Sequence, residues 1–142
     1  MAGTLFEGLV LIDSSAVIAL YDESEALHTT AQQFFENQQD LTWLALNVTS
    51  HESFTRLRYD TNLKTALAGY QFLRSNGVRP LTFAAADEDA ARRLIEKYAD
   101  KKLSFHDALC AAVMLREGIY RIFTFDSDFW AFGFQVLPGN TR

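Results

Sequence analysis

Cysteine, proline and long apolar runs are scarce in this sequence, and each scarcity excludes a class of protein. Cys110 is the only cysteine, so no disulfide forms within the chain and a zinc site built from several thiolates is not expected. The apolar stretch GLVLIDSSAVIAL is interrupted by Asp13 and two serines, so no membrane span is expected. The N-terminus lacks the basic start of a signal peptide, which predicts a cytoplasmic protein.

Basic residues are absent from the first 55 positions, which hold eight acidic residues and therefore a net charge of −8. All thirteen lysines and arginines follow, against ten acidic residues, so the remainder carries +3 and the whole chain −5. This asymmetry permits a basic surface beside an acidic site. Ordinary solvated helix faces explain it equally well.

No linker, internal repeat or low-complexity segment divides the chain. Its 142 residues, 49% of them hydrophobic, are enough for one compact domain with a sizeable core, so residues 1–142 are predicted to form a single domain. The only cysteine lies in the apolar run ALCAAVML, which predicts a buried, inert thiol.

Short apolar runs alternate with segments of helical periodicity. Strands are expected at Leu9–Ile12, 41–48, 78–83 and 122–125, with 134–137 as a candidate fifth strand. A turn or short helix is expected at Ser14–Tyr21, and helices at 24–38, 49–59, 61–75, 87–98 and 104–116.

Local signals mark several boundaries of these elements. Asn76-Gly77 is expected to end the helix 61–75, and Gly118 to end the helix 104–116. Pro80 cannot donate a backbone hydrogen bond, which favours an edge position for its strand. The alternation predicts an α/β fold with a mostly parallel sheet of four to five strands, covered by helices on both faces. In such sheets, ligands bind outside the carboxyl ends of the strands.

Acidic side chains are expected at that edge of the sheet. Asp13 directly follows the first strand, and Asp126 ends the fourth, with Asp128 just beyond it. Glu52 lies in the first turn of the helix after the second strand, and Asp107 in the first turn of a buried apolar helix. Carboxylates from four distant segments are therefore predicted to converge on one rim.

Each acid also has a purely structural explanation. The stretch TSHE at 49–52 matches a helix capping box, and SFHD at 104–107 resembles one. Asp13 could cap the helix that follows it, and Asp126 could stabilise a turn. Four acids at one edge would nevertheless repel one another, and their pKa values would rise unless a divalent cation neutralised them.

Carboxylate ligands are the preference of hard ions such as Mg²⁺ and Mn²⁺. Such ions activate water and stabilise charge in phosphodiester cleavage, without a nucleophilic side chain. Consistently, the sequence has no GxSxG, GxxxxGK[ST], GxGxxG or HExxH motif.

The stretches LIDSSAVIALYD, SHESFTRL, LSFHDALCAAV and IFTFDSDF, in this order, resemble PIN-domain proteins and in particular the small bacterial VapC-type toxins. The resemblance covers nearly the whole chain. It implies a Rossmann-like α/β/α sandwich and a Mg²⁺- or Mn²⁺-dependent endoribonuclease. It also implies a cognate antitoxin protein and a homodimer.

Carried over to this sequence, the resemblance implies catalytic and metal-binding roles for the acids. Asp13 and Asp107 are expected as primary ligands, Glu52 and Asp126 as ligands bound directly or through water, and Asp128 at or next to the metal. The small polar positions of the family match Ser14, Ser15 and Thr124.

Other residues receive weaker interpretations. Arg56, Arg58 and Lys64 are candidate RNA contacts, although Arg56 could instead pair with Glu52 one helical turn away. His106 immediately precedes a proposed ligand and points about 100° away from it on the helix, so it is interpreted as an ordinary histidine of the helix start.

Two alternatives to a nuclease remain open. One is a catalytically inactive PIN-like module that binds RNA or acts as a scaffold. The other is a Mg²⁺-dependent phosphotransferase with a nucleophilic Asp13. Position 15 is serine, so the D-x-D arrangement of one such class is missing.

Overall fold

Five strands form one entirely parallel sheet in the computed structural model of the chain, which describes residues 8–38 and 40–139. The order across the sheet is β3-β2-β1-β4-β5. The predicted α/β fold is therefore confirmed, including the fifth strand. The strands are β1 Leu9–Ile12, β2 Thr42–Leu46, β3 Val78–Leu81, β4 Arg121–Phe123 and β5 Gln135–Leu137.

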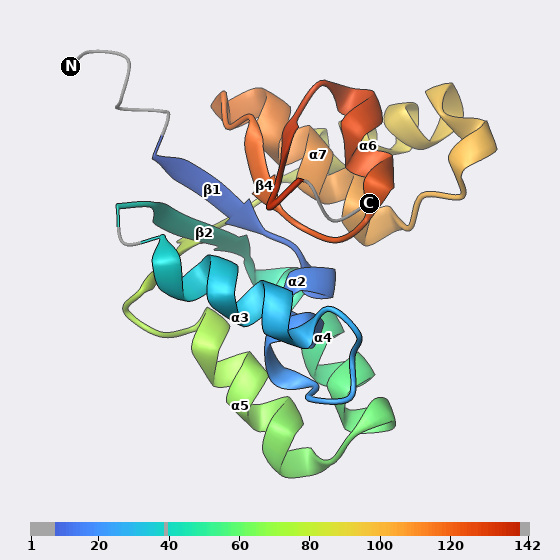
Figure 1. Cartoon of the computed structure of the whole chain (residues 1–142). Helices are drawn as coiled ribbons and strands as arrows, with labels where there is room; N and C mark the ends of the chain where they lie inside the picture. Colours follow the sequence, from blue (N-terminus) through green and yellow to red (C-terminus); the bar gives the residue numbers. More distant parts are fainter. Residues whose placement is uncertain (1–7, 39, 140–142) are drawn as a thin grey trace.

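Helices cover both faces of the sheet (Figure 1). One group (α2, α3, α4 and α5) lies on one face, and α6 and α7 lie on the other. The helices are α2 Ser14–Tyr21, α3 His28–Asn37, α4 Asn47–Asp60, α5 Leu63–Leu73, α6 Ala85–Lys97 and α7 Phe105–Glu117, with short 3₁₀ turns η1 Ala99–Lys101 and η2 Ser127–Phe132.

The central strand β1 is apolar along its whole length because helices cover both faces of the sheet. Successive side chains point to opposite faces of a sheet. Val10 and Ile12 therefore join the core beneath α2 and α5, while Leu11 joins the core beneath α7. All three are completely buried, and each contributes roughly 1.5–3 kcal/mol relative to an exposed side chain.

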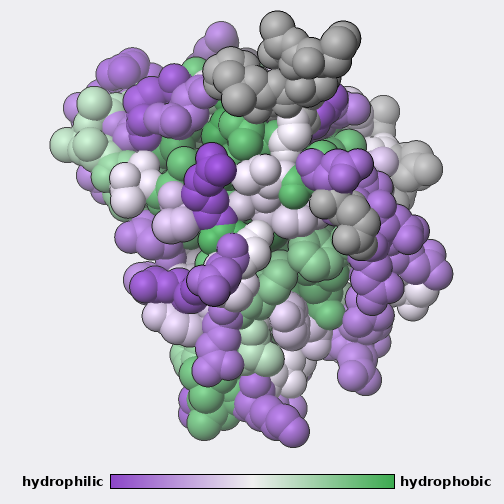
Figure 2. All heavy atoms as spheres, turned by 90° about the vertical axis from the view of Figure 1, so that its left-hand side faces the viewer, coloured by the Kyte–Doolittle hydropathy of each residue, from purple (hydrophilic) through white to green (hydrophobic). Residues whose placement is uncertain are grey.

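The outer surface is mixed in character. Seen from the side in Figure 2, hydrophobic residues show in several separate areas between hydrophilic ones. Within residues 8–38 and 40–139, no helix is long and apolar enough to span a bilayer.

Some boundaries differ from those predicted. Helix α4 begins at Asn47 with Leu46 as its N-cap, so the predicted capping box is wrong: Thr49 lies inside the helix and is buried. Helix α5 ends at Leu73, and Gly77 is not among the glycines with positive φ, so Asn76-Gly77 does not cap it. Helix α3 starts at His28 rather than at position 24.

Other local predictions are confirmed. The Ser104 side chain caps α7 by accepting from the backbone N–H of Asp107 at 3.0 Å. Gly118 ends α7 with φ 73°, in the left-handed region that favours glycine. Pro80 lies in β3, which is an edge strand. The turn η2 was not predicted.

Candidate active site

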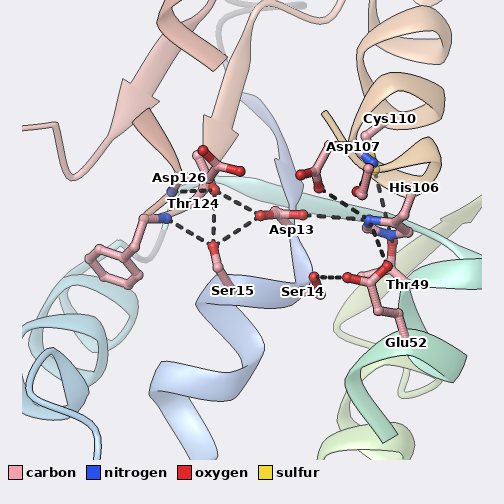
Figure 3. A network of polar contacts seen from close by, with 12 residues as sticks. Asp13, Ser14, Ser15, Thr49, Glu52, His106, Asp107, Cys110, Thr124 and Asp126 are labelled. Carbon is pink, nitrogen blue, oxygen red and sulfur yellow. Dashed lines mark hydrogen bonds and ion pairs between the residues drawn. The ribbon is translucent and has the colours of Figure 1, made fainter. Parts of the chain in front are cut away.

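The carboxyl ends of three adjacent strands bring the predicted acids to one rim of the sheet. Asp13 follows β1, and its backbone N–H donates to the carbonyl of Phe123 in β4 at 3.1 Å. Glu52 comes from α4, which follows β2, and Asp107 from the first turn of α7. Figure 3 shows these side chains together with the polar residues around them.

Asp13 is held by one of its two carboxylate oxygens. Its Oδ2 accepts hydrogen bonds from the Ser15 hydroxyl at 2.9 Å and from the Thr124 hydroxyl at 2.8 Å. Its Oδ1 is buried and has no hydrogen-bond partner among the described residues. The nearest charged group is the His106 ring, whose Nδ1 lies 3.8 Å away and too far for a hydrogen bond, so the burial of this carboxylate, which is 1% exposed, is costly. A cation bound at Oδ1 would remove this cost.

Ser15 and Thr124 are oriented so that their protons point at Asp13. The backbone N–H of Phe125 donates to the Ser15 hydroxyl at 3.0 Å, and that of Asp126 donates to the Thr124 hydroxyl at 3.0 Å. Because each hydroxyl oxygen already accepts, its proton is available for the carboxylate. The small polar residues named from the sequence thus fix the rotamer of Asp13.

Glu52 is fixed in a similar way at both oxygens. The hydroxyl of Ser14 donates to its Oε1 at 2.8 Å. Its Oε2 lies 3.3 Å from His106 Nδ1. The intrahelical ion pair between Arg56 and Glu52 is not formed in the described part of the chain.

His106 lies at the centre of the acidic cluster, so its interpretation as an ordinary helix-start histidine is wrong. Its Nδ1 is 3.4 Å from Asp107 Oδ1 and 3.8 Å from Asp13 Oδ1, in addition to its contact with Glu52. Its Nε2 contacts the Thr49 hydroxyl at 2.8 Å and Cys110 Sγ at 3.7 Å. The spacing of His106 and Cys110 was the missed signal, because residues four apart share one helix face.

The ring orientation indicates that Nδ1 carries a proton, because it faces only carboxylate oxygens, which accept. Nε2 faces the hydroxyl of Thr49 and the thiol of Cys110, each of which can donate or accept, so these groups suit this nitrogen with or without a proton. One imidazole therefore links the buried side of α7 to the acidic rim.

The site is electrostatically strained without a cation. Burial, together with the charges of Asp13 and Asp126, raises the pKa of Asp107 to about 6, although the hydrogen bond with His106 opposes this rise. Burial alone would lower the pKa of His106, but Cys110, Asp107 and Asp13 outweigh it and raise that pKa to about 11. The neighbouring carboxylates contribute to both shifts, and a divalent cation would offset that part of their charge.

Asp126 serves as both a turn residue and a source of charge. Its Oδ1 accepts from the backbone N–H of Asp128 at 2.9 Å and thereby caps η2. Its charge also raises the pKa of Asp107. The pKa of Asp128 is raised by burial and then by Asp126. The paired aspartates thus extend the acidic rim beyond β4.

The residues present fit a divalent cation. Asp13, His106 and Cys110 each offer a ligand atom within 4.8 Å of the others, but an imidazole and a thiol suit softer ions than Mg²⁺, so the carboxylates around them carry the argument for a hard ion. Glu52 and Asp107 contact the same imidazole nitrogen as Asp13. The unpartnered Oδ1 of Asp13 faces this cluster, and carboxylates suit a hard ion.

The predicted RNA contacts lie outside this cluster. Arg56 and Arg58 are exposed on α4, and Lys64 is exposed on α5. The aromatic residues Trp43 and Phe134 belong to the core.

Comparison with known proteins places the chain in a family. The model of the PIN domain matches residues 10–135. The chain is 29% identical over 131 residues to the 23S rRNA-specific endonuclease VapC20 of Mycobacterium tuberculosis, covering 92% of this chain and 99% of that protein.

Solved structures agree with the family match. The crystal structure of M. tuberculosis VapC20, described as a sarcin–ricin loop cleaving toxin, matches with a TM-score of 0.82 and 28% identity over 88% of this chain and 95% of that one. A toxin–antitoxin complex from Klebsiella pneumoniae matches with a TM-score of 0.61 at 16% identity, over 92% and 93% of the two chains, which supports the fold alone. The chain therefore belongs to the PIN domain family.

Proposed function

We propose that this protein is a divalent-metal-dependent endoribonuclease that hydrolyses RNA phosphodiester bonds and acts as the toxin of a toxin–antitoxin pair. The buried Oδ1 of Asp13, which makes no hydrogen bond and lies 3.8 Å from His106, supports the metal site most directly. The similarity to VapC20 over almost the full length of both chains supports the reaction. Because VapC20 is a 23S rRNA-specific endonuclease, 23S rRNA containing the sarcin–ricin loop is the first substrate to test.

The acids of the rim would hold Mg²⁺ or Mn²⁺. Asp13 and Asp107 act as primary ligands, Glu52 and Asp126 bind directly or through water, and Asp128 lies further out. When bound, the cation lowers the pKa of a water molecule and offsets negative charge that develops on the phosphate.

The protein prepares this site through its own contacts. Ser15 and Thr124 hold Asp13 so that one oxygen remains free for the cation. Ser14 restrains Glu52 from the start of α2. His106 holds the carboxylates of Asp13, Glu52 and Asp107 around its Nδ1. Such outer contacts commonly change metal affinity or activity by about 10–100-fold when removed.

The same proposal includes two protein partners. The first is a cognate antitoxin that inhibits the toxin, and the second is another copy of the chain, with which it forms a homodimer. A protein that cleaves ribosomal RNA works in the cytoplasm. Co-purification with the product of an adjacent gene, and the mass of the isolated chain in solution, test these two associations.

Cleavage assays test the function directly. Wild-type protein is incubated with 23S rRNA and with unrelated RNAs, with Mg²⁺, with Mn²⁺ or with a chelator. We expect metal-dependent cleavage, lost in Asp13→Asn and Asp107→Asn and retained in the control Asp89→Asn, an exposed residue of α6. Equal cleavage by all variants would contradict the assignment of these acids.

Two other outcomes would favour the alternatives. Tight RNA binding without cleavage under any metal would support a PIN-like binding module. A phosphorylated Asp13 after incubation with a phosphodonor would support a phosphotransferase.

A further inference from the structure

A groove along the outer strand β3 has no role in the proposed chemistry. Its volume is about 610 Å³, within the range typical of ligand sites. The end of β2, the start of α4, the segment after α5 and strand β3 itself form its walls. The polar residues that line it are Asn47, Ser50, Arg74, Ser75, Asn76 and Arg79.

The charge of the groove is positive and unneutralised. No acidic residue lines it among the described residues. Arg74 and Arg79 are exposed, and neither forms an ion pair within the described ranges. By contrast, Arg116 pairs with Asp87 on the opposite face of the sheet. Two unpaired guanidinium groups in a chain of net charge −5 favour an anionic ligand.

A ladder of planar side chains runs from the groove to α4, the helix that also carries Glu52. The guanidinium of Arg74 lies 5.6 Å from the ring centroid of Tyr70. The Tyr70 ring is stacked on His51, with centroids 6.4 Å apart and an interplanar angle of 12°. His51 immediately precedes Glu52 in α4. The two ends of the ladder, Arg74 and His51, are exposed.

The start of α4 connects the groove with the acidic rim. Asn47 and Ser50 line the groove, whereas Thr49 contacts His106 and Glu52 contacts Ser14. An RNA strand that passes the active site therefore needs to cross only the first turns of α4 to reach the groove.

We propose that this groove binds the RNA strand that flanks the scissile phosphate. This proposal rests on the proposed nuclease function. Arg74 and Arg79 contact phosphates, and bases stack on the exposed ends of the ladder, His51 and Arg74. Stacking and cationic contacts are the usual means of binding single-stranded nucleic acid.

RNA fits this groove better than a protein partner does. Protein interfaces are centred on apolar and aromatic anchors. The large exposed hydrophobic side chains of the described chain lie elsewhere, and none lines the groove: they are Tyr59, Leu63, Leu67, Phe105, Leu115, Tyr120 and Trp130.

Binding is tested in the Asp13→Asn background without metal, by the fluorescence anisotropy of a labelled sarcin–ricin loop RNA. We expect Arg74→Ala and Arg79→Ala each to weaken binding and to lower the slope of log K against log salt by about 0.7. Arg93→Ala, an exposed arginine of α6 on the other face, is the matched control and should bind as the parent does.

The ladder is tested by substitutions that separate shape from charge. Tyr70→Ala removes the ring that supports both His51 and Arg74 and should therefore weaken binding, and Tyr70→Phe should restore it. Arg74→Lys keeps the charge but not the plane, so it should keep the salt slope and still lose affinity. Thermal melting of each variant reports any loss of folding separately.

The outcomes distinguish a failure of the groove proposal from a failure of the proposed nuclease function. If wild-type protein cleaves RNA while Arg74→Ala, Arg79→Ala and Tyr70→Ala bind and cleave like the parent, the groove proposal is wrong and the function stands. The same result combined with loss of binding to the antitoxin would assign the groove to the protein partner instead. Absence of cleavage by the wild type contradicts the proposed function, whatever the binding data show.

Discussion

His106 provides the most discriminating perturbation of the acidic site, because its two nitrogens contact different groups. In His106→Asn, the side-chain amide nitrogen can occupy approximately the place of Nδ1 and still face the carboxylates. In His106→Gln, it can reach the place of Nε2 and still contact the Thr49 hydroxyl. The two variants thus remove opposite halves of the interaction.

The expected magnitudes differ for stability and for metal binding. His106→Asn leaves the hydroxyl of Thr49, which is 0% exposed, without its 2.8 Å partner, at a cost of about 1–3 kcal/mol in the free energy of unfolding. His106→Gln removes the nitrogen that lies 3.3–3.8 Å from Glu52, Asp107 and Asp13. That loss should weaken Mn²⁺ binding or cleavage about 10–100-fold.

Two assays separate these effects. Denaturant unfolding gives the stability of each variant, and calorimetric titration with Mn²⁺ gives its metal affinity without reference to RNA. We expect His106→Asn to lose more stability and His106→Gln more metal affinity. Tighter Mn²⁺ binding by His106→Gln or His106→Ala would show that the imidazole competes with the cation, and would refute the positioning role given to it here.

Three further predictions follow from individual contacts. Thr124→Val removes a hydroxyl that donates to Asp13 at 2.8 Å, so cleavage should fall about 10–100-fold, whereas the exposed control Thr55→Val should cleave normally; unchanged cleavage by Thr124→Val would contradict the role of Asp13. The hydrogen bond from Arg116 lowers the pKa of Asp87. The ionised carboxylate therefore stabilises the protein above pH ~4, and this stabilisation is lost as the pH falls through the folded-state pKa. Asp87→Asn should lower the free energy of unfolding by about 1–3 kcal/mol at neutral pH and leave it unchanged in acid, as measured by urea unfolding. Gly118→Ala should destabilise the protein by about 1–2 kcal/mol, because φ is 73° there, and an equal melting temperature would contradict this.

The centre of the sheet could be predicted because β1 is buried on both faces. Leu9–Ile12 is apolar throughout, and an uninterrupted run of this length fits a central parallel strand. The caps of α7 at Ser104 and Gly118 could also be predicted, since helix caps depend on local geometry alone. The start of α4 could not be predicted, because the S/T-x-x-E pattern at a helix start also fits two residues that share one face inside a helix. Thr49 is such an interior residue, and its side chain contacts His106 of α7.

The acidic rim was predictable only in outline. The chain position of Asp13, directly after β1, fixes its place at the carboxyl edge. The central position of His106 depends on how α7 is rotated against β1 and α4, which brings together residues more than fifty positions apart. Periodicity gives the buried face of a helix but not which partner a polar residue on that face will meet.

The account depends above all on a divalent cation held at the acidic rim. A crystal of the protein soaked in Mn²⁺ and recorded at the manganese absorption edge tests this most directly. The predicted result is an anomalous peak in contact with Oδ1 of Asp13 and with Asp107. Full occupancy of Mn²⁺ elsewhere, or no peak beside Asp13 in a protein that still cleaves RNA, would contradict it.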